Sequence, residues 1–282
     1  MGATVARRLP KIAIRVGVWL WVLGALLPFV FMLVTSLKPE GLAITIPPVW
    51  HFTPTLDNYR AVLTQGGTSS SQSMVPLLMH SAIVALCATA LAIVVGVPAA
   101  YALTLERFRP RRFLAMWILS TIMFPPIVAV IPVFIFVGNL GMLDTYPALI
   151  VPYAGFNLPM VVWILRSTIH QIPREIEQAA MADGASRFTA LWRVILPLTV
   201  PGIATSAIFS VILCWNEFLF ALTLTRENVQ TAPVGVSQFT GLYGTQWGFL
   251  TAASTVIVAP ILVLTLILRR RFVSGMTFGA VK

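Results

Sequence analysis

The sequence predicts an all-α, polytopic membrane protein with six transmembrane helices and a polar helical element between the fourth and the fifth. Of its 282 residues, 58% are hydrophobic and only 10% are charged, whereas a soluble domain carries about 25% charged residues. Six apolar runs are long enough to cross a bilayer. The basic residues gather at the ends of these runs. Together these observations exclude an ordinary soluble domain.

The six spans follow the apolar runs in chain order. The first run is longer than the roughly 7–15 apolar residues of a secretory signal peptide, so we expect it to be retained. We expect one transmembrane domain over residues 1–282. Its spans cover about residues 12–34, 75–103, 113–137, 146–167, 198–224 and 249–268, and the polar segment between the fourth and fifth spans covers residues 172–197.

The third and fourth spans each contain three prolines. A proline inside a span removes a backbone donor and bends the helix, which is tolerated where a neighbouring helix or a water-lined cavity satisfies the freed carbonyl. These spans are therefore candidates for bent helices that line a pathway, and a simple packing kink is the alternative. The prolines are Pro125, Pro126, Pro132, Pro147, Pro152 and Pro159.

Two spans carry small residues at every fourth position, and such rows let helix backbones approach closely. We expect both rows to be packing faces, although small residues are common in membrane helices generally. The second span has Ala88, Ala92, Gly96 and Ala100, and the fifth has Gly202, Ser206, Ser210 and Cys214.

The distribution of basic residues predicts the orientation, because cytoplasmic loops carry an excess of Lys and Arg. One side has only Lys38, Arg60 and Arg226. The other side holds both termini and the polar segment, and we place it in the cytoplasm. A net charge of +10 suits nucleic acid, but this placement indicates membrane lipid and no nucleic-acid partner. The cytoplasmic set is Arg7, Arg8, Lys11, Arg15, Arg107, Arg109, Arg111, Arg112, Arg166, Arg174, Arg187, Arg193, Arg269, Arg270, Arg271 and Lys282.

The polar segment between the fourth and fifth spans has the signals of two short helices joined by a bend. Pro173 suits a first helical turn, and Glu175 and Glu177 lie near the positive end of the helix that follows. Gly184 is placed to end that helix in a left-handed turn, and Ser186 can cap the second helix. We expect this element to lie outside the lipid and to offer small residues for contact with another protein.

One acidic residue lies inside a span. Glu217 belongs to the stretch Trp215-Asn216-Glu217-Phe218, and a carboxylate in hydrocarbon is costly unless it faces the bundle interior, a cavity or the interface. Two interpretations remain open. Trp215, Asn216 and Glu217 form part of a translocation pathway or its gate, or Glu217 anchors neighbouring helices by hydrogen bonds.

Several motifs of cofactor chemistry are absent from the sequence. None of the three lysines is followed by Ser or Thr, so the chain has no phosphate-binding loop of the P-loop type. The three histidines are far apart, and both cysteines fall in apolar runs. We therefore expect no metal and no cofactor in this chain.

The polar segment resembles a known motif. Gln178-Ala-Ala180, followed by Gly184 and then by Val194-x-Leu196-Pro197, is similar to the EAA motif of binding-protein-dependent ABC importers, E-A-A-x3-G-x9-I-x-L-P. The spacing is intact, which makes the similarity specific. Gln178 replaces the usual Glu, and Val194 replaces the usual Ile.

The resemblance covers nearly the whole chain and is strongest to carbohydrate-uptake permeases, in particular the second permease subunit of maltose-type importers. His80-Ser81 stands where many relatives have Asn-Ser. The similar stretches are Thr55-Leu-Asp-Asn-Tyr59, Ala99-Ala-Tyr-Ala-Leu103, Leu140-Gly-Met-Leu-Asp-Thr145, Ile176 through Ser186, Trp215-Asn-Glu-Phe218 and the tail from Gly275 to Lys282.

The resemblance implies a transport subunit, not an enzyme, in the cell membrane of a prokaryote. The implied partners are a second permease, two ATPase subunits that hold ATP and Mg, and an extracytoplasmic binding protein that delivers a sugar or sugar-like solute. The polar segment would act as a coupling helix that links ATPase closure to alternating access. The implied ATPase contacts are Glu177, Gln178, Ala179, Ala180, Asp183, Gly184, Leu196 and Pro197, with Gly279, Ala280, Val281 and Lys282 in the tail.

Two other functions are compatible with six spans. A stand-alone secondary transporter or channel would use Glu217 as a proton or ion site. A membrane enzyme would need clustered His, Asp and Glu, but the nine acidic residues are dispersed. The intact motif spacing favours the importer permease, and only the resemblance indicates carbohydrate.

Overall fold

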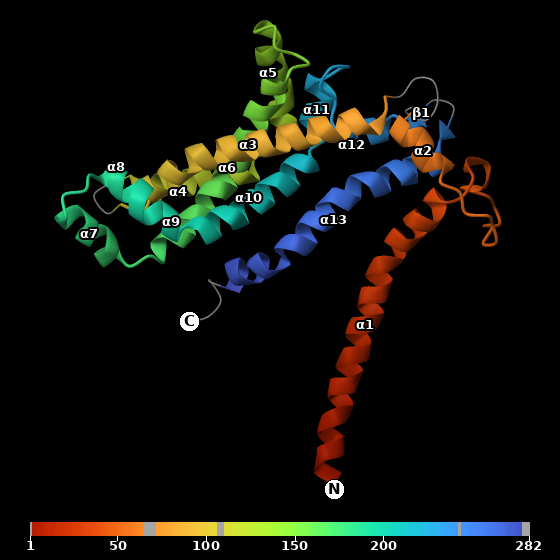
Figure 1. The fold of residues 1–282 in the computed structure, drawn as a ribbon, viewed down its shortest axis with the longest axis horizontal. Coiled ribbons are helices and arrows are strands. Elements are labelled where there is room, and N and C mark those ends of the chain that lie inside the picture. Colours follow the sequence, from red (N-terminus) through yellow and green to blue (C-terminus); the bar gives the residue numbers. More distant parts are fainter. Residues whose placement is uncertain (1, 65–71, 106–109, 242–243, 278–282) are drawn as a thin grey trace. The chain divides into compact units, whose positions relative to one another are not determined.

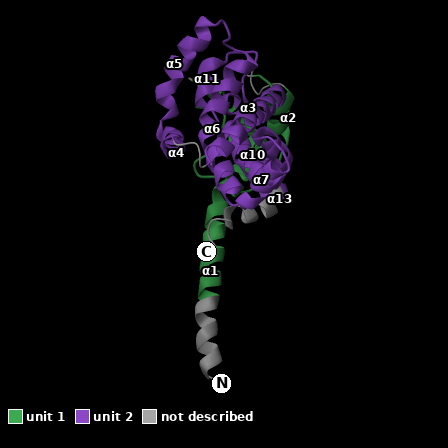
Figure 2. Ribbon diagram, turned by 90° about the vertical axis from the view of Figure 1, so that its left-hand side faces the viewer, with its two compact units in different colours: residues 1–74, 236–258 green, residues 75–235, 259–282 purple. Residues whose placement is uncertain are grey.

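The fold is helical throughout the part of the chain that the computed structural model describes, residues 2–64, 72–105, 110–241 and 244–277 (Figure 1). Within these residues the only strands are β1 (Thr240–Gly241) and β2 (Gly244–Thr245), which form one antiparallel pair. The predicted all-α class is therefore confirmed. The chain divides into two compact units, residues 1–74 with 236–258 and residues 75–235 with 259–282 (Figure 2).

The first unit contains the end of α1 and the residues that tie it to α2. The buried Asn58 amide donates to the carbonyl oxygens of Ser36 at 2.9 Å and of Lys38 at 2.7 Å. The Glu40 carboxylate accepts a hydrogen bond from the Phe249 N–H at 3.2 Å. The elements of this unit are α1 (Gly2–Ser36), η1 (Glu40–Leu42), α2 (Asp57–Thr64), the β1–β2 pair and the first part of α13 (Trp247–Thr277).

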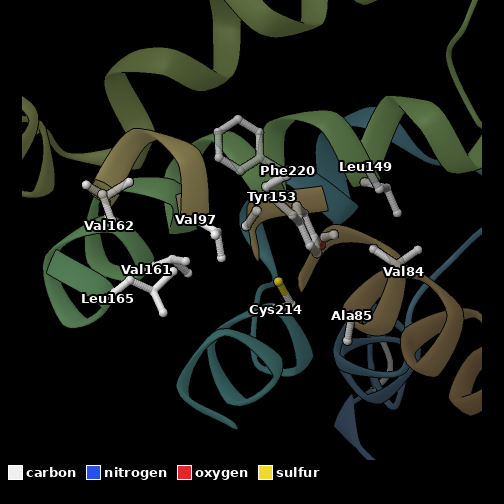
Figure 3. Packing of buried hydrophobic residues seen from close by; sticks show 14 of the residues in the cluster. Val84, Ala85, Val97, Leu149, Tyr153, Val161, Val162, Leu165, Cys214 and Phe220 are labelled. Atoms are coloured by element: carbon white, nitrogen blue, oxygen red, sulfur yellow. The ribbon is translucent and has the colours of Figure 1, made fainter. Parts of the chain in front are cut away.

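The second unit is a bundle in which α6 (Tyr146–His170) is the central helix and α10 (Val200–Trp215) packs along it. Its core contains Tyr153, Leu149 and Phe220, all at most 2% exposed (Figure 3). The other elements are α3 (Met74–Ala102), α4 (Arg111–Ser120), η2 (Thr121–Met123), α5 (Pro126–Asn139), α7 (Arg174–Ala182), α8 (Arg187–Ala190), the π-helical turn η3 (Leu191–Ile195), α9 (Leu196–Leu198), α11 (Leu219–Leu224) and α12 (Ala232–Ser237).

The two rows of small residues are buried where helices approach closely. A Cβ atom added at Gly96 would lie 2.8 Å from the Val161 side chain, and one added at Gly202 would collide with Thr168. The Thr89 hydroxyl donates to Ser210 at 3.1 Å between α3 and α10. The prediction that these rows are packing faces is confirmed.

Four helices are long and apolar enough to cross a bilayer among the described residues, or up to six if each of two bent pairs is one span. The four are Ile12–Ser36, Met74–Ala102, Tyr146–His170 and Trp247–Ile267; the bent pairs are Arg111–Met123 with Pro126–Asn139, at 93°, and Arg187–Leu198 with Val200–Trp215, at 75°.

Two of the predicted spans are not single helices. The third bends by 93° next to Pro125 and Pro126, because neither proline has a backbone N–H to continue the helix. The predicted bend is confirmed for the third span, whereas the fourth, a candidate on the same grounds, is the single helix α6 with Pro152 and Pro159 inside it. The fifth, expected as one run over residues 198–224, ends as α10 at Trp215 and resumes as α11 at Leu219. The organisation of residues 1–282 as a single domain stays a prediction.

Candidate functional site

The segment between α6 and α10 folds into two short helices joined by a bend, as the sequence predicts. The first helix, α7, begins after Pro173, and Glu175 and Glu177 lie in its first turn. Carboxylates at this position interact favourably with the positive end of the helix dipole. None of the α7 side chains is fully buried. The helix therefore lies on the surface of its unit.

The bend depends on Gly184, whose φ is +90°. The Ala185 N–H reaches back to the Ala180 carbonyl at 3.0 Å and the Gly184 N–H to the Met181 carbonyl at 3.1 Å, which closes the end of α7. A Cβ atom at Gly184 would have open space around it. The requirement for glycine therefore comes from the backbone angle, which L side chains rarely adopt.

The second helix begins at the predicted cap. The Ser186 hydroxyl oxygen accepts a hydrogen bond from the Thr189 N–H at 3.2 Å. The chain then passes through the π-helical turn η3, which buries Leu191 and Ile195, and through α9 at Leu196-Pro197. Helix α10 follows with a 75° bend. Leu196 and Pro197 thus join the bend to a spanning helix.

The exposed residues of the α7–α9 segment combine small and apolar side chains. Gln178 and Ala179 are exposed, and Ala180 is half-buried. Met181 is 37% exposed and Phe188 is 73% exposed. Phe188 packs against Trp192 with 5.9 Å between the ring centroids, and together these side chains form the exposed apolar part of the segment.

Glu177 and Gln178 are neighbours in the sequence but differ in their burial and in their contacts. Glu177 is half-buried, and its carboxylate accepts a hydrogen bond from the Tyr101 hydroxyl at the end of α3. Gln178 stays exposed. Asp183 is also exposed and ends α7. Of the acidic residues assigned to ATPase contact, Glu177 therefore already has a partner within the chain.

The stretch Trp215–Phe218 is the break between α10 and α11. Trp215 is 7% exposed, and the Asn216 amide donates to the Ile212 carbonyl at 2.7 Å. Both Glu217 carboxylate oxygens accept backbone N–H groups, from Phe220 at 3.0 Å and from Ala221 at 3.3 Å. Glu217 thus caps α11, the helix that directly follows it, and the predicted anchoring of neighbouring helices stays a prediction. A role of the three residues in a pathway or gate stays a prediction.

Buried polar groups on α6 lie close to α10. The Asn157 amide donates to the Tyr153 carbonyl at 2.8 Å and to the Cys214 sulfur at 3.3 Å. The Asn157 side-chain oxygen is buried and has no hydrogen-bond partner among the described residues, and the buried Tyr153 hydroxyl lies close to Glu217. Tyr153 and Cys214 belong to the apolar core shown in Figure 3.

Asp144 lies just before the amino end of α6, and its sequence context predicts no role for it. Its φ is +59°. Its carboxylate accepts four backbone N–H groups, from Arg226, Glu227, Asn228 and Val229, at 3.0–3.2 Å. Burial alone would raise the pKa of Asp144, but these four hydrogen bonds outweigh it and lower the pKa to about 2. The stretch Leu140–Thr145 was noted only for its resemblance.

The segment that Asp144 holds is also tied to α3. The Ala232 N–H donates to the Ser81 hydroxyl at 2.8 Å, and His80 Nδ1 lies 3.0 Å from the Gln230 carbonyl oxygen. His80 packs edge-on against Tyr146 with 5.8 Å between ring centroids. The His80-Ser81 pair, which the sequence left without an interpretation, therefore anchors residues 230–232.

No group of three or more His, Cys, Asp or Glu side chains that could hold a metal ion occurs in the described part of the chain. The four tail residues, Gly279 to Lys282, lie outside the described residues.

Comparison with known proteins identifies the family. Residues 92–278 match the family described as "Binding-protein-dependent transport system inner membrane component". The chain belongs to this family. It is therefore a multi-pass transport permease and not an enzyme. This decides between the functions that the sequence left open.

Relatives match this permease over nearly their full length. The "Trehalose/maltose transport system permease protein MalG" of Thermococcus litoralis is 35% identical and covers 97% of this chain and 98% of its own. The "Trehalose transport system permease protein SugB" of Mycobacterium tuberculosis is 39% identical over 92% of this chain and 93% of its own. Among solved structures, a bacterial ABC transporter involved in alginate import has a TM-score of 0.75 at 20% identity, covering 94% of this chain and 97% of its own.

Proposed function

We propose that this permease carries a sugar or sugar-like solute across a prokaryotic cell membrane as one of two membrane subunits of an ATP-driven importer. Relatives named for trehalose or maltose, sulfoquinovosyl glycerol and diacetylchitobiose are 33–36% identical to it and support the solute class. The proposed partners are a second permease, two ATPase subunits that hold ATP and Mg, and an extracytoplasmic binding protein.

The observation that carries the proposal is the exposed bend of α7 and α8. Gln178, Ala179 and Phe188 are exposed on it, and Gly184 sets its angle. Small residues at Ala179 and Ala180 allow another protein to approach closely, and Phe188 supplies apolar area. We therefore assign this surface to a groove of the ATPase.

The coupling to transport follows from continuity of the chain. The helical turns from α8 through η3 and α9 lead into α10 through Leu196-Pro197. Buried Leu191 and Ile195 hold this stretch against the bundle. Movement of a docked ATPase would thus displace α10, and a two-state bundle would change its access from one side to the other.

The break between α4 and α5 supports a pathway on the face of the bundle that these two helices form. The carbonyl of Ile122 has Pro125 and Pro126 at the positions that would donate to it in a helix, and neither has an N–H. Non-helical backbone at membrane depth is tolerated only where protein covers it or water lines it. The break is thus suited to face the partner permease and the pathway, not lipid.

The cavity beside this break has few polar groups that could recognise a solute. Its volume is about 510 Å³, and its only hydroxyls, on Ser120 and Thr121, donate to carbonyls of their own helix at 2.7 and 2.6 Å. Sugar recognition needs converging polar groups. Selectivity therefore belongs to the partner permease or the binding protein, with Trp215, Asn216 and Glu217 as this chain's candidates for the pathway.

The orientation is also part of the proposal. Both termini and the α7–α9 segment lie in the cytoplasm, because the basic residues gather on that side. The tail residues Gly279, Ala280, Val281 and Lys282 would reach the ATPase. The nonpolar helix α1 has exposed side chains over most of Ile12–Ser36, which suits lipid or the second permease as its surroundings.

A pull-down in mild detergent tests the proposal. The chain is expressed with its neighbouring genes, and the partners are identified by mass spectrometry. We expect an ATPase and a second permease, and hydrolysis of ATP stimulated by a sugar in the presence of the binding protein. Recovery of the chain alone, with uptake that stops when the proton gradient is dissipated, would contradict it.

A further inference from the structure

A cavity at the carboxyl end of α6 has no part in the proposed coupling or pathway. Its volume is about 320 Å³, and it is lined by Trp163, Arg166, Ser167, His170 and Gln171. These residues are spaced by three or four positions along the helix and share one face of it. The site is therefore a groove along the last two turns of a spanning helix.

The groove offers hydrogen-bond donors and no carboxylate. The lining side chains include a guanidinium, a hydroxyl, an imidazole and an amide. The Arg166 Nε atom is buried and has no hydrogen-bond partner among the described residues. A buried donor without an acceptor costs free energy, so the Arg166 Nε atom is held in a position that the described chain leaves unsatisfied, and the donors that the groove can offer to a ligand are the other polar groups of its lining.

Trp163 and the helix end hold the guanidinium in place. The Arg166 guanidinium lies 5.8 Å from the centre of the Trp163 ring, within the range of a cation–π interaction. The partial negative charge at the end of α6 favours a cation at this position. The same charge does not favour an anion, so the side-chain donors must supply the attraction.

The position of the groove indicates that an anion bound there comes from a lipid headgroup. It lies at the end of the span Tyr146–His170, and Trp163 is 45% exposed. Tryptophan is enriched at membrane–water interfaces, and basic pockets beside transmembrane helices bind anionic headgroups. Arginine matches the geometry of a phosphate through two parallel hydrogen bonds.

We propose that this groove binds the phosphate of an anionic lipid headgroup, with Arg166 as the main ligand, His170, Ser167 and Gln171 as further donors, and Trp163 as the interfacial wall. The inference does not depend on the solute or on the ATPase contacts. A lipid held at this point would lie directly beside the start of the segment that leads to α7.

The test is a native mass-spectrometry titration of the purified full chain in detergent. The probes are dioctanoyl phosphatidylglycerol, dioctanoyl phosphatidylcholine and inorganic phosphate. We expect the wild type to retain phosphatidylglycerol in preference to phosphatidylcholine, and Arg166→Gln to weaken this binding on the order of tenfold, as expected for loss of a charge-assisted hydrogen bond. Arg193→Gln, on η3 outside the groove, is the matched control.

A second variant protects the test against misfolding. His170→Gln changes an exposed side chain and should weaken phosphatidylglycerol binding about two- to fivefold, as expected for one hydrogen bond. Equal retention of both lipids, or unchanged binding by both variants, would overturn the proposal. Competition by inorganic phosphate at similar concentration would assign the groove to a free anion instead of a lipid.

Discussion

Helix α6 is flanked by two connecting segments that treat their hydrogen-bonding groups in opposite ways. At its amino end, residues 225–232 have backbone donors bound by the side chains of Asp144 and Ser81. At its carboxyl end, the α7–α9 segment is tied to α3 by the hydrogen bond from Tyr101 to Glu177. It also exposes Phe188.

The difference indicates which segment is stabilised by contacts within the chain and which leaves a surface for a partner. A loop with most of its backbone donors bound by neighbouring elements gains its shape from the chain itself. The α7–α8 pair exposes apolar side chains on both sides of a glycine turn, and we propose that another protein covers this surface. The first is therefore an anchor, and the second is the docking element that we propose for the ATPase.

The largest expected effect is on the docking element. Gly184→Val places a β-branched residue at φ +90°, which costs roughly 1–3 kcal/mol of strain. The bend should open, and the amount of ATPase that co-purifies should fall by about tenfold or more, with loss of uptake. Quantitative immunoblotting of the purified complex measures the effect.

Gly141→Val is the matched control for this change. Gly141 has a φ of +66° and also has open space around its Cβ position, but it lies in the α5–α6 turn. It should keep the ATPase bound. Equal loss of ATPase in both variants would show general instability and would remove the distinction between the two segments.

The next effect is on the anchor. Asp144→Ala removes an acceptor of four backbone N–H groups and should lower the free energy of unfolding on the order of 3 kcal/mol. The apparent melting temperature in detergent should fall by several degrees. Uptake per folded complex should stay near the wild-type level, since the anchor takes no part in docking.

The pH dependence of the anchor gives an independent check. The folded-state pKa of Asp144 is lowered to about 2, below the usual value of about 3.9. Its contribution to stability is therefore present above about pH 4 and is lost as the pH falls towards 2. Asp144→Asn should show a smaller loss of melting temperature over this interval. Parallel curves for both proteins would contradict the assignment.

A smaller effect is expected where the docking element contacts α3. Tyr101→Phe removes the hydrogen bond that ties α7 to α3 and should leave the ATPase bound but reduce solute transport per ATP about two- to fivefold, as expected for loss of one hydrogen bond. The hydroxyl of Tyr59 also binds a side chain, that of Ser36 at 2.6 Å. Tyr59→Phe is therefore the control, and an equal change in both would argue against a coupling role.

The smallest effect concerns Gln178, which stands where the motif has Glu. Gln178 is exposed and lies beside the Tyr101-bound Glu177, so Gln178→Glu should change ATPase affinity by no more than about threefold, as typical for an exposed ion pair. Titration of the ATPase onto immobilised permease measures it. A tenfold change would show that position 178, and not the bend itself, dominates docking.

Local features of the fold were predictable from the sequence. Pro125 and Pro126 predicted the bend of the third span, Gly184 predicted the left-handed turn, and Ser186 predicted the cap of α8, because each acts through its own backbone or that of near neighbours. The four-residue spacing of small side chains likewise predicted the packing faces.

Contacts between distant residues were not predictable in this way. Asp144 meets residues 82–85 positions further along the chain, and the sequence showed only an acid in a turn. The Tyr101–Glu177 hydrogen bond joins residues 76 positions apart. The break at residues 216–218 was missed, because an apolar run does not reveal where its carboxylate turns back to cap the next helix.

The sequence by itself determined the class of protein and the approximate spans, and it predicts the place of the docking element, since chain length in hydrocarbon, proline chemistry and motif spacing act locally. Only the tertiary structure decided which side chains are already satisfied within the chain. The answer depends on which donor lies opposite which acceptor. In the folded chain Glu177 has a partner and Gln178 is exposed. Likewise, Asp144 binds backbone N–H groups, whereas Phe188 stays exposed.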